Sequence, residues 1–227
     1  MMKRCILTAA MLVAVASAAM AATLNATVVE IAGKVEYQLP GKGWKPAKVG
    51  DSLPKGTIVS TGFKSTVLLK VGPSTVTVKP ITRLSLEEIL QSESGTQTQL
   101  FLMAGRVKAE VTPQAGSPVE FQVKSPTATA SVRGTGFEFD GTNLLVEHGA
   151  VQLRAPHGMT RYVRNGEFSY VATNGSVTSP AAVSPEGGLE RVDELIDQAD
   201  SDSRVDVQLG GAIDVTTPTA TVIITIQ

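Results

Sequence analysis

Residues 125–153 read SPTATASVRGTGFEFDGTNLLVEHGAVQL, and this stretch decides the fold class. Apolar residues alternate in it with polar or small ones, which is the pattern of β-strands that bury one face. Gly134 interrupts the alternation where a bulge or a close approach of backbones is expected. Asp140 and Gly141 form the type of dipeptide that closes a tight hairpin before the chain returns. The stretch therefore predicts a broken strand followed by a hairpin in an all-β protein.

The same pattern continues on both sides, from Thr27 to Val177. Short runs rich in Val and Thr are separated by Gly, Pro, Asn and Asp, and helix-forming residues are scarce. We expect an all-β fold, either a twisted β-sandwich or a solenoid-like stack of short strands, with one short C-terminal helix. An internal sequence repeat favours the stack. Gly33 and Gly149 each begin a Gly-x-Val step, and in both cases a Gly–acid pair follows 17 residues later. Chance reuse of such steps in β-proteins is the alternative.

The first 21 residues have the features of a secretory signal peptide. Lys3 and Arg4 form a basic start, residues 6–16 are apolar, and the step from Ala19 to Ala21 fits the small-x-small rule, so we expect cleavage after about Ala21. The apolar run is shorter than the roughly 20 residues that a spanning helix needs, and a retained anchor is the alternative. The mature 206 residues would contain no cysteine, 18 basic and 21 acidic side chains. We therefore expect a periplasmic or secreted bacterial protein, without disulfides and without attraction to nucleic acid.

The composition changes after residue 178. We expect a β-domain over residues 22–178, a linker with a short helix over 179–204, and a β-tail over 205–227. The Ser-Pro pair at 184–185 is typical of a helix start. Three apolar residues follow at helical spacing: Leu189, Val192 and Ile196. Residues 220–226 are apolar and β-branched, so they predict a strand that joins the sheet or pairs with a neighbouring chain.

The sequence shows no constellation for catalysis, cofactor binding or metal binding. The mature chain has two histidines, His148 and His157, and together with Glu147 they lack the spacing of metal ligands. A small acidic cluster after the predicted helix lacks the glycine and the closing glutamate of an EF-hand, so we expect a solvated helix end there. The cluster consists of Asp197, Asp200 and Asp202. We expect a protein that is not an enzyme and has no catalytic residues, no cofactor and no metal.

A series of short motifs resembles the FecR domain family. The central one combines a Pro-x-Ala step, the run Val-Arg-Gly-Thr-x-Phe and an acid-x-Gly-x-Val step. Gly-x-Val, Trp-x-x-Ala, Gly-x-x-Leu-x-x-Gly and Thr-Gly-x-x-Ser elements precede it in the order found in the family, between Gly33 and Ser65. The resemblance extends from about Thr27 to Ala172 and implies an architectural role for the motif residues. These are Trp44, Gly50, Gly56, Pro126, Arg133, Gly134, Thr135, Phe137 and Gly149.

In the best-known members of this family, a membrane-spanning regulator carries the domain outside the cytoplasm. There it reads the state of a TonB-dependent outer-membrane transporter and signals to a cytoplasmic sigma factor. We expect this chain to depart from that plan, since it shows neither an anti-sigma segment nor a spanning helix after signal cleavage. The resemblance then implies an exported module that binds an unidentified envelope protein. Two alternatives stay open: a structural component that self-associates through the C-terminal strand, and a module that binds glycan or peptidoglycan.

Two of the motif residues are also candidates for contact with a partner. Arg133 is expected either to be buried, with its five donors bound to carbonyls freed by the break at Gly134, or to be presented to a partner's carboxylate. Trp44 is expected either to plug an edge of the core or to act as an aromatic binding residue. Three lysines near Trp44 indicate that it lies close to the surface, and they are Lys42, Lys45 and Lys48.

Overall fold

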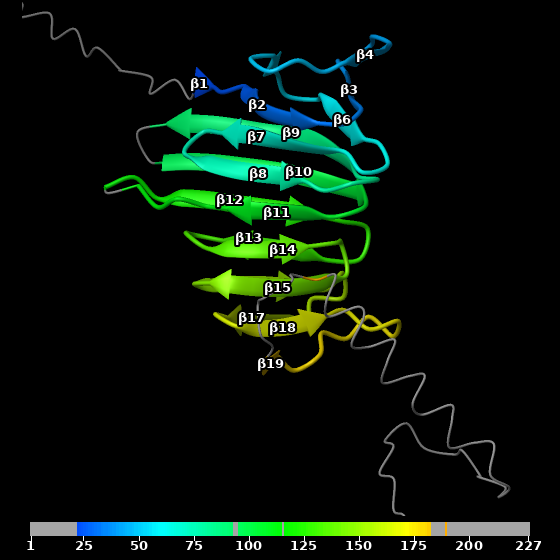
Figure 1. Cartoon of the computed structure of the whole chain (residues 1–227). Coiled ribbons are helices and arrows are strands. Elements are labelled where there is room, and N and C mark those ends of the chain that lie inside the picture. The colour runs from blue at the N-terminus through cyan, green and yellow to red at the C-terminus, as the bar shows by residue number, and fades with distance from the viewer. Residues whose placement is uncertain (1–21, 93–94, 115, 183–188, 190–227) are drawn as a thin grey trace, which may run out of the picture. The chain divides into compact units, whose positions relative to one another are not determined.

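The computed structural model describes residues 22–92, 95–114, 116–182 and 189 of the 227-residue chain. Its strands belong to two sheets, one of ten strands and one of nine (Figure 1). Among the described residues, no helix is long and apolar enough to cross a membrane. The expected all-β fold class is confirmed. The expected signal peptide and β-tail lie outside the described residues, and so does the expected C-terminal helix apart from Leu189.

The strands divide between the sheets as follows. Sheet A contains β1 (Ala22–Thr23), β3 (Val35–Gln38), β4 (Trp44–Pro46), β6 (Ile58–Thr61), β9 (Arg83–Ser92), β10 (Gly95–Ala104), β12 (Val119–Lys124), β13 (Thr129–Val132), β16 (Ala150–Arg154) and β17 (Thr160–Arg164). Sheet B contains β2 (Ala26–Ala32), β5 (Ser52–Leu53), β7 (Thr66–Val71), β8 (Ser74–Val78), β11 (Val107–Glu110), β14 (Gly136–Phe139), β15 (Asn143–His148), β18 (Glu167–Tyr170) and β19 (Ala181–Ala182).

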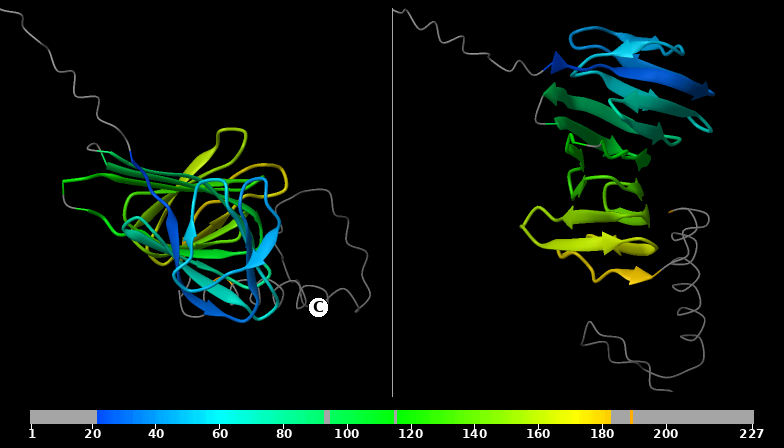
Figure 2. Two further views of the ribbon diagram at one scale, coloured as in Figure 1. Left: turned by 90° about the horizontal axis from the view of Figure 1, so that it is seen from above. Right: turned by 90° about the vertical axis from the view of Figure 1, so that its left-hand side faces the viewer.

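The chain winds between the two sheets and mostly adds two neighbouring strands at each visit. Sheet A runs in the order β4-β3-β6-β9-β10-β12-β13-β16-β17, and sheet B runs β5-β2-β7-β8-β11-β14-β15-β18-β19. Figure 2 shows the strands of both sheets following one another from the blue N-terminal strands to the yellow C-terminal ones. The fold therefore combines the two expected arrangements, a sandwich of two sheets and a stack that grows along the chain. Gly33 and Gly149 occupy equivalent places in it, each at a passage from sheet B to sheet A.

From β7 onward, one strand departs from this pattern of two strands per visit. β11 is a single pass through sheet B, between β8 and β14. Because the chain crosses sheet B only once here, β12 returns to sheet A in the same direction as β10, and the two pair in parallel from Thr96↔Val119 to Phe101↔Lys124. The other pairings between described strands are antiparallel. As a result, the connection between β13 and β14 lies beside the C-terminal end of β11.

The hairpin expected at Asp140 and Gly141 is present between β14 and β15, with Phe139 opposite Leu144. One carboxylate oxygen of Asp140 accepts hydrogen bonds from the backbone N–H groups of Thr142, at 2.9 Å, and Asn143, at 2.7 Å. This is the local capping that makes Asp a frequent first residue of such turns.

The core lies between the sheets and receives alternate residues of each strand, as in β10, where buried and half-buried positions alternate. Its largest fully buried side chains include Phe121 from sheet A and Phe137 from sheet B. Their rings meet edge to face with centroids 6.5 Å apart, which is a favourable geometry for aromatic pairs. This contact joins the two sheets beside the Val-Arg-Gly-Thr motif.

The outermost described strands are short. β4 has three residues, and β5 and β19 have two residues each. β17 is longer, with five residues, and carries the exposed side chains of Arg161 and Arg164.

Candidate functional site

The Val-Arg-Gly-Thr motif forms the passage from β13 in sheet A to β14 in sheet B, and Thr135 fixes this passage. The backbone N–H of Thr135 donates to the carbonyl of Val111 at 3.1 Å, and the N–H of Val111 donates back to the carbonyl of Thr135 at 3.0 Å. The buried hydroxyl of Thr135 donates to the carbonyl of Ala150 at 3.0 Å and accepts from the N–H of Ala150 at 3.3 Å. Thr135 thus ties together the end of β11 and the start of β16.

Two glycines of the motif allow these backbones to approach closely. A Cβ on Gly134 would lie 2.5 Å from Cγ of Pro113. A Cβ on Gly149 would lie 2.7 Å from the hydroxyl of Thr135 and 2.9 Å from the carbonyl oxygen of Gly134. No side chain fits at these separations, so glycine is required at the junction of the three segments.

The other motif residues lie in turns or in the core. Phe137 is fully buried, and Pro126 is exposed in the turn between β12 and β13. Gly56 donates its N–H to the carbonyl of Leu86 at 2.7 Å, and Gly50 donates its N–H to the carbonyl of Val28 at 2.8 Å.

Arg133 departs from the expected architectural role. Its side chain is exposed, and its guanidinium forms no hydrogen bond or ion pair within the part of the chain that the structure describes. The expectation of a buried arginine that binds freed carbonyls is wrong, because Thr135, the next residue but one, satisfies the backbone groups at this passage. The guanidinium is therefore free to bind a ligand.

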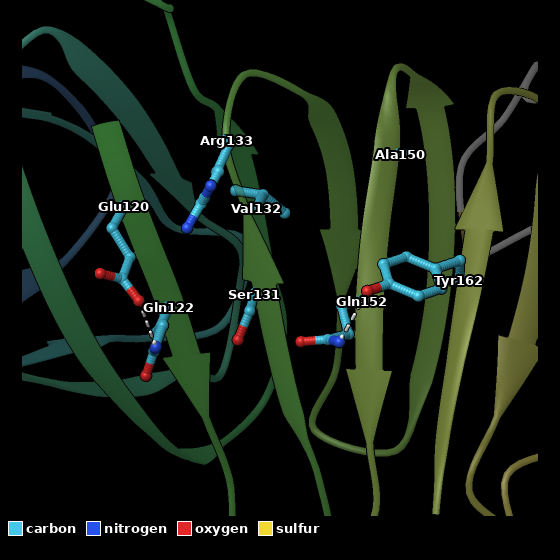
Figure 3. A pocket seen from close by; sticks show the side chains of 8 residues that line it. All are labelled: Glu120, Gln122, Ser131, Val132, Arg133, Ala150, Gln152 and Tyr162. Atoms are coloured by element: carbon cyan, nitrogen blue, oxygen red, sulfur yellow. Dashed lines mark hydrogen bonds between the residues drawn. The ribbon is translucent and has the colours of Figure 1, made fainter. Parts of the chain in front are cut away.

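Arg133 stands at the rim of a polar groove of about 540 Å³ on the outward face of sheet A (Figure 3). The groove is lined by residues of β12, β13, β16 and β17 and by Arg133, which directly follows β13: Glu120, Gln122, Ser131, Val132, Arg133, Ala150, Gln152 and Tyr162. It is hollow because the central strands carry the small side chains of Ser131 and Ala150, while longer side chains rise on both sides. We refer to these eight residues as the polar groove.

Two hydrogen bonds hold the walls of the polar groove. The amide of Gln122 donates to the carboxylate of Glu120 at 3.2 Å, and the amide of Gln152 donates to the hydroxyl of Tyr162 at 3.1 Å. Both bonds are drawn in Figure 3. The ring of Tyr162 remains 60% exposed. The groove therefore offers fixed amides, the carboxylate of Glu120, an exposed tyrosine and a guanidinium that has no partner among the described residues.

Trp44 lies in another part of sheet A, in the outermost strand β4, and five strands separate it from β13. The structure therefore does not bring the two candidate contact residues together. The indole of Trp44 is 42% exposed, so it is not a plug in the core. The guanidinium carbon of Arg83 lies 5.4 Å from the centre of the indole, within the range of a cation–π contact. Of the neighbouring lysines, Lys45 lies over the ring of Tyr37, whose hydroxyl raises the pKa of Lys45 by hydrogen bonding.

Arg83 also borders a hollow of about 380 Å³ where β9 begins and β10 ends, with Ile81 and Met103 among its lining residues. Ile81 is 65% exposed and Met103 is 38% exposed. We call Trp44, Ile81, Arg83 and Met103 the Trp44 surface. The guanidinium of Arg83 has no acidic partner among the described residues.

Ile81 is held in a strained conformation, with φ = +53°. A β-branched residue rarely adopts this left-handed region, because its side chain crowds its own backbone. The turn is fixed by neighbours: the N–H of Ile81 donates to the carbonyl of Gly62 at 3.2 Å, and the N–H of Thr82 donates to the hydroxyl of Thr61 at 2.9 Å. An exposed apolar side chain at a strained position is the kind of feature that accompanies function.

Both histidines lie at the surface, as the sequence predicts. His148 is bonded to the carboxylate of Glu110 at 2.8 and 3.0 Å, and His157 is exposed near Gly175. In the described ranges, no group of three His, Cys, Asp or Glu side chains is placed to hold a metal ion. The acidic residues Asp197, Asp200 and Asp202 lie outside those ranges.

Sequence reasoning missed Arg83, Ile81 and Met103 as partners of Trp44. They come from segments that become neighbours only through the strand order of sheet A, since Arg83 on β9 is paired with Ser60 on β6 and Ala104 on β10. The available signal was local: an apolar Ile directly after Pro80 in a turn, where a polar residue or glycine is usual.

Comparison with protein-family models matches residues 57–152 to the family described as FecR protein. Two crystal structures of a candidate anti-sigma factor from Parabacteroides distasonis ATCC 8503 are similar to this chain, with 18% identity and TM-scores of 0.47 and 0.46. Both similarities cover 56% of this chain and 60% of the other, so this chain spans about three fifths of that protein's length. No curated protein matches the sequence.

Proposed function

We propose that this protein is an exported module that binds another protein of the cell envelope and takes part in signalling, a proposal supported by the match of residues 57–152 to the FecR protein family. The basic and apolar start of the sequence, with its small-x-small step before Ala22, supports export. The single observation that carries the binding proposal is the Trp44 surface.

The Trp44 surface has the composition of a protein-binding hot spot. Tryptophan and arginine are the residues most enriched at such sites, and methionine adapts to the shape of a partner. The contact with the indole orients the guanidinium of Arg83 before any partner arrives, which lowers the entropic cost of binding. The surface beside Arg83 is concave, so it can accommodate an apolar side chain that protrudes from a partner protein. We infer a partner segment that places an apolar side chain in the hollow and a carboxylate on Arg83.

The test is photo-crosslinking in cells, with the full chain expressed with its own N-terminus and a photoreactive residue at Met103. We expect one reproducible partner protein in the envelope fraction. Trp44→Ala and Arg83→Ala should each reduce its capture about tenfold or more, since loss of a hot-spot side chain costs at least about 2 kcal/mol and 1.4 kcal/mol is tenfold in affinity. Tyr170→Ala is the matched control, because Tyr170 on sheet B is 39% exposed, close to the 42% of Trp44. Recovery of no partner, or equal capture by wild type and Trp44→Ala, would contradict the proposal.

Ile81→Gly should separate stability from binding. Glycine removes the strain of the left-handed conformation, which costs about 1–3 kcal/mol, and adds less than about 1 kcal/mol of entropy to the unfolded state. We expect the free energy of unfolding to rise by roughly 1 kcal/mol while partner capture falls, as in other trade-offs between stability and activity.

Val49→Gly is the control for this variant. Val49 is β-branched and 65% exposed, as Ile81 is, but its φ is not positive. It should therefore lose stability by up to about 1 kcal/mol through the entropy of glycine alone. Denaturant titrations measure both variants, and a loss of stability of equal size in the two would show that Ile81 is not strained.

A further inference from the structure

The polar groove lies on the outward face of strands whose backbone groups are already paired. β12 pairs with β10 and β13, β13 with β12 and β16, and β16 with β13 and β17. An extended peptide usually binds a sheet by adding a strand at a free edge, where backbone groups give affinity. That mode is closed at this face, so a ligand in the groove must be recognised by side chains alone.

The side chains form a regular row across four strands. Gln122 is opposite Ser131, Ser131 is opposite Gln152, and Gln152 is opposite Tyr162. Since neighbouring strands lie about 4.8 Å apart, the row presents a hydrogen-bonding group at each step of about that length. Amides and hydroxyls both donate and accept, so the row suits a ligand whose own groups do the same, which is the chemistry of sugar hydroxyls.

Two further features of the polar groove restrict the chemical class of ligand that it can bind. Tyr162 is largely exposed and its hydroxyl is held by Gln152, so its ring is available to stack against the apolar face of a sugar ring. Arg133 places a planar, unpaired guanidinium at the same groove, and guanidinium binds carboxylate with two parallel hydrogen bonds. The volume of about 540 Å³ lies within the range of small-molecule sites.

We propose that the polar groove binds an oligosaccharide that carries carboxylate groups, with Arg133 on a carboxylate, Tyr162 against a sugar ring, and Gln122, Ser131 and Gln152 on hydroxyls. This site is separate from the Trp44 surface and goes beyond the protein-binding role.

The test is calorimetric titration of the purified protein with two tetrasaccharides, one of uronic acid units and one of neutral N-acetylglucosamine units. The uronic acid oligomer should bind at least tenfold more tightly than the neutral one. Arg133→Ala should weaken its binding tenfold or more, because a bidentate charge-assisted pair is lost. Arg133→Lys should restore only part of the affinity, since an ammonium cannot form the planar pair.

The matched control is Arg154→Ala, because Arg154 is also exposed at the end of a sheet A strand but does not line the groove. Tyr162→Ala provides a second variant that tests the ring contact without changing charge. Absence of binding by either oligomer, or equal affinity in wild type and Arg133→Ala, would overturn the proposal. Binding of hexaglutamate as tight as that of the uronic acid oligomer would also overturn it, since it would show attraction to charge alone.

Discussion

Gly149→Ala is expected to lower the free energy of unfolding by about 2–5 kcal/mol. Gly149 has φ = +83°, a conformation that costs an alanine about 1–2 kcal/mol. The added Cβ would also lie 2.9 Å from the carbonyl oxygen of Gly134 and 2.7 Å from the buried hydroxyl of Thr135. The backbones must then separate, which costs a further 1–3 kcal/mol and strains the bonds between Thr135 and Ala150. Urea denaturation measures this loss.

Comparison with Gly50→Ala isolates the steric part of that effect. Gly50 has φ = +89°, almost the same as Gly149, but a Cβ there meets no atom within 4 Å. It should therefore cost only about 1–2 kcal/mol from backbone strain. If the two variants lost the same stability, the close packing of the Val-Arg-Gly-Thr passage would not be a source of stability.

Phe121→Ala should cost about 3–5 kcal/mol, the usual range for a fully buried phenylalanine. The variant loses buried apolar area and its edge-to-face contact with Phe137, and it leaves a cavity between the sheets. Thermal unfolding followed by circular dichroism measures the effect as a large drop in Tm.

Phe63→Ala is the control for this second prediction. Phe63 is 75% exposed, so its removal should change stability by no more than about 0.5 kcal/mol. A comparable drop in Tm for both variants would mean that Phe121 does not occupy a packed core.

The fold class followed from local signals. The alternation of residues 136–139 and the Asp140–Gly141 turn led to an observed hairpin with the expected capping by Asp140. The break at Gly134 was also visible, but a glycine cannot reveal whether the next strand stays in the same sheet. That depends on where β14 finds a partner, which is β11, more than 20 residues earlier.

The candidate site was less accessible to sequence reasoning. Arg133 follows a buried residue and precedes a kink, and this position alone does not distinguish a bond to backbone carbonyls from exposure. The outcome was decided by Thr135, whose hydroxyl and backbone fill the bonds that an arginine was expected to make. The lysines around Trp44 indicated a position near the surface but left a plug at the edge of the core open, and the strand order that brings Arg83 within 5.4 Å of its ring is a long-range property.

The short outermost strands determine how the stack ends. A stack of this kind can extend onto another molecule wherever a long, flat strand presents unpaired backbone groups. β5 and β19 present only two residues each and β4 three, which is too little backbone to start a stable pairing. β17 is long enough, but it carries two exposed charged side chains, Arg161 and Arg164, and charged residues on an edge strand oppose pairing with another chain. Growth of the sheets from one molecule into the next is thereby suppressed at both ends of the described stack.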